Sequence, residues 1–81
     1  MGISAFKRLD KVAQLEVIYE IGDKVAELED HSYVLELFQV YDFYVQITSY
    51  SKTNVLFSIK SFDINSEVLD RYLTSIPIPV I

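Results

Sequence analysis

Two glutamates and the only histidine of the chain are spaced by two residues, at Glu27, Glu29 and His31. In a β-strand this spacing places side chains on one face, where two carboxylates and an imidazole could ligate a divalent metal. The segment Asp30–Ser32 is typical of a turn, however, and a turn there would break that geometry. Exposed charges beside a hairpin turn also guard an edge strand against unwanted pairing. We therefore expect no metal site here.

The composition disfavours most other catalytic chemistry. The chain has one histidine and no cysteine, so the usual general bases and nucleophile pairs are nearly missing. Two glycines, Gly2 and Gly22, cannot form a glycine-rich phosphate loop. A pair of carboxylates could still act as acid and base, but no spacing singles one out. We predict that the protein is not an enzyme, has no catalytic residue and binds no cofactor.

Acidic residues are concentrated in the middle of the chain. Between Val12 and Ser51 there are eight acids against the single base Lys24, a local charge of −7, while the whole chain carries −5. Such a field repels phosphate backbones, which disfavours nucleic-acid binding. The acids either offer a surface to a basic partner or keep a small sheet protein soluble.

The first element that must position these residues is a helix from Leu9 to Gly22. Asp10 can cap its start, and Gly22 can end it through a positive φ. Its apolar residues recur at three- and four-residue steps: Val12, Leu15, Ile18 and Tyr19. Residues 1–8 are predicted to be a frayed or loosely docked arm, with Phe6 as its strongest anchor.

Alternating, β-branched and aromatic residues predict strands after this helix. The four expected strands are Lys24–Glu29, Tyr33–Tyr41, Phe43–Tyr50 and Val55–Phe62. Asp42 is a weak turn signal, so the second and third could also be one long strand with a bulge. A second helix is predicted over Asn65–Leu73, capped by Asn65 or Ser66, and two prolines make residues 76–81 an extended apolar tail.

The order α-β-β-β-β-α predicts an α+β fold: an antiparallel four-stranded meander with both helices packed on one face. We expect one domain over residues 1–81, with the arm at 1–8 and the tail at 76–81. The longest uncharged runs are far shorter than the roughly 20 residues that a membrane-spanning helix needs, and no targeting signal is visible. These features predict a cytoplasmic protein.

Four short segments carry a resemblance to other proteins: Asp42–Val45, Lys52–Asn54, Ser61–Phe62 and Leu69–Leu73. With them, the region from Leu9 to Leu73 resembles small uncharacterised bacterial proteins in which a helix ending in glycine leads into a strand meander. The resemblance implies that fold and a bacterial origin. It implies no activity and no functional residues.

The period of two sorts the third strand into two faces. Phe43, Val45 and Ile47 are expected to be buried under the helices, as are Val55, Phe57 and Ile59 of the next strand. Tyr44, Gln46, Thr48 and Tyr50 then lie on the opposite face. Four residues of the next strand are expected beside them: Leu56, Ser58, Lys60 and Phe62. An amphipathic, tyrosine-rich face of this kind suits either contact with a protein or simple shielding by neighbouring side chains.

The function predicted from these features is a non-enzymatic protein-interaction module that forms a homodimer. The predicted contact residues on the sheet face are Tyr44, Gln46, Tyr50 and Phe62. Ile76 and Ile78 are added because the extended tail can pair with a sheet edge in its own chain or in another. The alternative is an acidic inhibitor or immunity-type protein that covers a basic surface of an enzyme or a nucleic-acid-binding protein.

Overall fold

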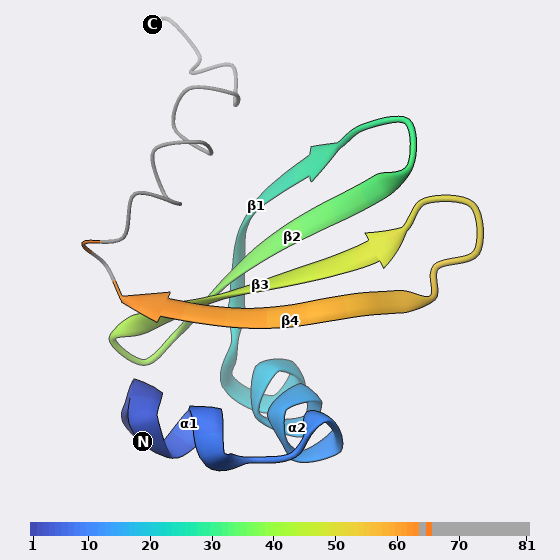
Figure 1. The fold of residues 1–81 in the computed structure, drawn as a ribbon. Coiled ribbons are helices and arrows are strands. Elements are labelled where there is room, and N and C mark those ends of the chain that lie inside the picture. The colour runs from blue at the N-terminus through green and yellow to red at the C-terminus, as the bar shows by residue number, and fades with distance from the viewer. Residues whose placement is uncertain (64, 66–81) are drawn as a thin grey trace, which may run out of the picture.

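The computed structural model describes residues 1–63 and 65, which form two short helices and a four-stranded sheet (Figure 1). The elements are α1 (Ile3–Arg8), α2 (Lys11–Ile21), β1 (Asp23–Glu29), β2 (Tyr33–Val40), β3 (Phe43–Tyr50) and β4 (Leu56–Asp63). The strands pair antiparallel in the order β1-β2-β3-β4, which confirms the α+β meander. The helix predicted over Asn65–Leu73 and the tail at 76–81 lie outside the described residues. Within the described part of the chain, no helix is long and apolar enough to cross a membrane.

Helix α2 begins as predicted but ends differently. The Asp10 side chain caps it by accepting a hydrogen bond from the Ala13 N–H at 2.8 Å. Gly22 does end the helix, but its φ is −75°, so the predicted positive φ is wrong. A Cβ at Gly22 would lie 2.5 Å from the Ile18 carbonyl oxygen, so glycine is needed for close approach and not for a left-handed conformation.

The predicted arm at residues 1–8 is instead a helix, α1, and this corrects the sequence interpretation. A six-residue helix is too short to be stable by itself. It is held by Phe6, whose side chain is fully buried and whose ring lies 5.4 Å from that of Phe43. The prediction that Phe6 is the anchor is confirmed.

The apolar stripe of α2 is narrower than predicted. Ile18 is buried, and Leu15 and Val17 pack against the same core. Val12 and Tyr19, by contrast, are 65% and 75% exposed. Both described helices lie below the sheet (Figure 1). Helix α2 buries only a narrow stripe of its side chains against the sheet.

The β2–β3 connection is a two-residue hairpin and not a bulge within one long strand. Val40 pairs with Phe43, and Tyr41 between them has a φ of 53°. A tyrosine in this left-handed region is uncommon, because glycine, asparagine and aspartate are preferred there, and this explains why the turn signal at Tyr41–Asp42 is weak.

Strand β4 begins at Leu56, one residue later than predicted. The β3–β4 pairing shifts between Thr48 and Ser49, and this reverses two predictions. Leu56 packs against the core and not on the opposite face, while Val55 is exposed and not buried. Such an irregularity changes which residues face inward. Ile59 packs against the core as predicted, and the side chain of Phe57 lies outside the described part of the structure.

The core lies between the helices and one face of the sheet, here called the helix-side face. Its buried members are Phe6, Ile18, Val40, Phe43, Val45 and Ile47. The predicted burial of Phe43, Val45 and Ile47 is therefore confirmed, and with it the predicted register of β3.

Candidate functional site

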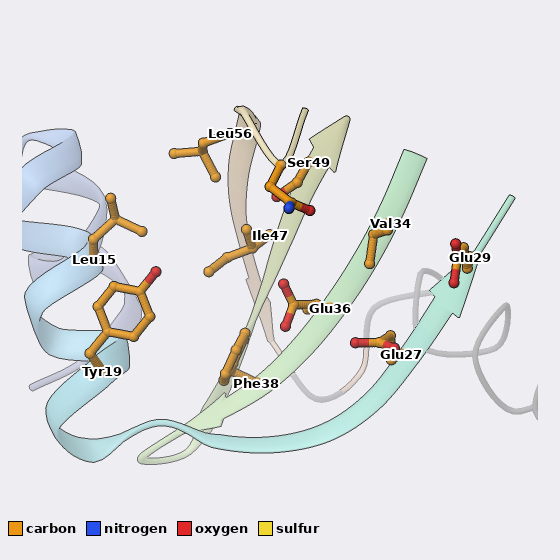
Figure 2. Close-up of a pocket in the computed structure, with 11 residues that line it drawn as sticks. Leu15, Tyr19, Glu27, Glu29, Val34, Glu36, Phe38, Ile47, Ser49 and Leu56 are labelled. Atoms are coloured by element: carbon orange, nitrogen blue, oxygen red, sulfur yellow. The ribbon is translucent and has the colours of Figure 1, made fainter. Parts of the chain in front are cut away.

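A cavity of about 500 Å³ opens between α2 and the helix-side face of the sheet (Figure 2). Leu15 and Tyr19 line it from α2, and Phe38 and Ile47 line it from β2 and β3. Its remaining wall carries three carboxylates: Glu27 and Glu29 from β1, and Glu36 from β2. We call this cavity the acidic groove.

The strand register brings these carboxylates together. Glu27 pairs directly with Glu36 across β1 and β2, and Glu29 pairs with Val34, so all three glutamates share the helix-side face. Like charges directly opposite one another are destabilising. Lys24 offsets this, because its ammonium pairs with Glu27 and lies 3.0 Å from a carboxylate oxygen of Glu36.

These contacts stabilise the charged form of Lys24. Its hydrogen bond to Glu27, followed by that to Glu36, raises the pKa of the lysine above its usual value. The pairs are partly exposed, so each contributes at most about 1 kcal/mol to stability. Three carboxylates and one ammonium leave the groove with a net charge of −2, so the groove is acidic despite this lysine.

The histidine lies apart from the glutamates that the sequence spacing associated with it. Strand β1 ends at Glu29, and His31 falls in the following turn. It lines a different cavity with Tyr33, Tyr50 and Lys52. Among residues 1–63 and 65, no group of three histidine, cysteine or acidic residues is arranged to hold a metal ion.

The turn before β2 is organised by Asp30. Its carboxylate accepts hydrogen bonds from the backbone N–H groups of Ser32, at 2.9 Å, and Tyr33, at 2.8 Å. These two bonds stabilise the ionised form and lower the pKa of Asp30 below its ordinary value of 3.8. The turn that contains His31 is therefore organised by a charged side chain.

This shift predicts a particular pH dependence of stability. A lowered pKa in the folded state contributes stability that is fully present above the unfolded value and is lost as pH falls through the folded one. We expect the urea midpoint of the wild type to fall more than that of Asp30→Ala as pH is lowered from 5 to 2. Urea unfolding at a series of pH values measures this difference. Parallel curves for the two proteins would contradict the role given to the carboxylate.

The opposite side of the sheet, here called the aromatic face, carries the predicted contact residues. Tyr44 lies beside Phe62 with ring centroids 6.3 Å apart, and Tyr50 lies 5.4 Å from Tyr33. Gln46 lies between these two pairs along the strand and donates a hydrogen bond to the hydroxyl of Thr48 at 3.4 Å. Of the predicted contact residues, Ile76 and Ile78 are outside the described residues.

The aromatic face is more enclosed than the alternating pattern suggests. Thr48 is only 7% exposed and Leu37 only 3%, although both lie on this face by register. Cross-strand and diagonal neighbours on a sheet are within reach of aromatic side chains, so a period of two does not by itself predict exposure.

The register separates charge between the two faces. Glu27, Glu29 and Glu36 lie on the helix-side face, whereas Asp23, at the start of β1, is the only carboxylate of the described strands that pairing places on the aromatic face. Sequence reasoning connected Glu27 and Glu29 but missed Glu36 and Tyr19. The two-residue spacing of Glu36 and Phe38, which puts both side chains on one face of a strand, was the signal that could have placed Glu36 on the inner face.

Two surfaces therefore stand out in the described part of the chain: a hollow, acidic one beside α2 and an aromatic one on the other side of the sheet. Comparison of the chain with protein-family models, curated proteins and solved structures finds no match.

Proposed function

We propose that this protein is a non-enzymatic interaction module that forms a homodimer through its aromatic face. The observation that carries the proposal is the pair of aromatic contacts, Tyr33 with Tyr50 and Tyr44 with Phe62, on the side of the sheet opposite the two described helices. Tyrosine and phenylalanine are enriched at protein interfaces, where they provide large contact areas.

The distribution of charge favours the aromatic face over the helix-side face as the contact with a second copy. In a two-fold symmetric dimer the same patch meets itself, so any excess charge in the patch faces an equal charge. The chain carries a net charge of −5, and the glutamates of its strands lie on the helix-side face. The aromatic face lets two copies meet with the least repulsion.

The size of the chain supports the same proposal. A domain of 81 residues without disulfides has a small core, and association commonly adds to the stability of such domains. The apolar tail with Ile76 and Ile78 adds a second contact in this proposal, as an extended segment at a sheet edge. Neither nucleic acid nor membrane is part of it.

Sedimentation equilibrium at micromolar concentration is expected to give a mass near twice that of the chain. Gln46→Lys should shift the equilibrium to monomer, because Gln46 is paired with Lys60 across β3 and β4 and the variant would place two positive charges at the contact. Ser4→Lys makes the same change of charge on the exposed surface of α1 and should leave the dimer intact.

Two results would refute the proposed dimer. One is a wild-type protein that remains a monomer at millimolar concentration. The other is equal sedimentation of Gln46→Lys and the wild type, which would show that copies associate elsewhere. Circular dichroism of each variant separates loss of association from loss of folding.

A further inference from the structure

We infer that the acidic groove is a docking site for a basic segment of a partner protein, which places an arginine or lysine side chain against the groove wall. This inference goes beyond self-association, because the groove and the aromatic face lie on opposite sides of the sheet. It concerns a different partner with the opposite charge.

The floor of the groove fits the apolar part of such a side chain. Leu15, Ile47 and Leu56 reach it from α2, β3 and β4, and Phe38 reaches it from β2. Each of these residues belongs to or packs against the core, so the floor is held by the fold. Arginine and lysine combine a long apolar stem with a charged end, and the stem can lie along such a surface.

The wall of the groove fits the charged end. Figure 2 shows Glu27 and Glu36 projecting from neighbouring strands into the space that faces α2. Lys24 neutralises one of the three carboxylates, and within the described residues Glu29 has no ion pair. The groove therefore retains a charge of −2 beside an apolar floor, and complementary charge attracts a cationic partner.

Tyr19 supplies a further feature of the groove. It is 75% exposed on α2, yet it lines the cavity opposite the carboxylates (Figure 2). An aromatic ring that lines the same cavity as three carboxylates favours an arginine-bearing segment, because the ring face attracts a cation and carboxylates accept hydrogen bonds from a guanidinium. A basic peptide therefore fits better than a second copy of this chain, whose net charge is −5.

A titration with one defined probe tests the inference. The probe is a blocked hexapeptide of alternating leucine and arginine, and its comparator has citrulline, the neutral isostere, in place of each arginine. Isothermal titration calorimetry should show saturable binding of the arginine peptide that weakens as salt rises. Amide NMR shifts should map to Tyr19, Glu27, Glu36 and their neighbours.

Paired variants locate the site. The double variant Glu29→Gln and Glu36→Gln should weaken arginine-peptide binding by about tenfold or more, because both charges line the groove. Asp42→Asn, in the exposed β2–β3 turn outside the groove, should bind within about twofold of wild type. Circular dichroism melts check that each variant is folded.

Several outcomes would overturn the inference. They are absence of saturable binding up to millimolar peptide, equal binding of the citrulline peptide, and an equal loss of affinity in Asp42→Asn. If the double glutamine variant altered sedimentation instead, the occupant would be a second copy. The dimer and the peptide site are tested independently, because Gln46→Lys should disrupt the dimer and leave peptide binding unchanged.

Discussion

Replacing Phe6 by Ala is expected to lower the free energy of unfolding by about 3–5 kcal/mol, the usual range for truncating a fully buried phenylalanine. The side chain is 0% exposed, and its ring lies against that of Phe43 in the centre of the core. The loss leaves a cavity and also releases α1, which is too short to remain helical without this contact. Urea unfolding followed by circular dichroism measures the change.

Phe62→Ala provides the matched control, because Phe62 is half-buried on the aromatic face. It should cost clearly less than Phe6→Ala, and in the proposed dimer its main effect should be on association. A Phe6→Ala protein as stable as the wild type would show that α1 does not dock and that residues 1–8 are the loose arm that the sequence suggested.

Ile47→Ala is expected to cost about 2–5 kcal/mol, whereas Gln46→Ala at the adjacent position should cost far less. Ile47 is buried on the helix-side face, where it belongs to the core cluster. Gln46 points to the other face and donates its hydrogen bond to Thr48 at a long 3.4 Å. In a domain stabilised by only about 5–15 kcal/mol, the first change removes a large share of the stability.

The urea midpoints of Ile47→Ala and Gln46→Ala show which face of β3 is buried. A larger loss in Gln46→Ala would mean that the register of β3 is inverted and that the aromatic face is the core. Measuring both at low and high protein concentration separates folding from association, because only an effect on the dimer depends on concentration.

The sequence by itself determined the local elements. The alternation of Phe43, Val45 and Ile47 with polar neighbours allowed only one face to be buried, since burying Gln46 would have required hydrogen-bond partners. Asp10 predicted the start of α2 because an aspartate there can accept a free N–H of the first turn. Short connections between the strands then predicted the meander order.

The tertiary structure decided where those elements meet. Residues 1–8 have too few positions for a helical pattern, and α1 is stabilised by packing on the core, above all by the burial of Phe6 beside Phe43. The shift in β3–β4 pairing turned Leu56 inward, and no residue type signals such a shift. The groove likewise joins Tyr19 of α2 to Glu27 and Glu36, because contact between a helix and two strands depends on packing and not on spacing in the chain.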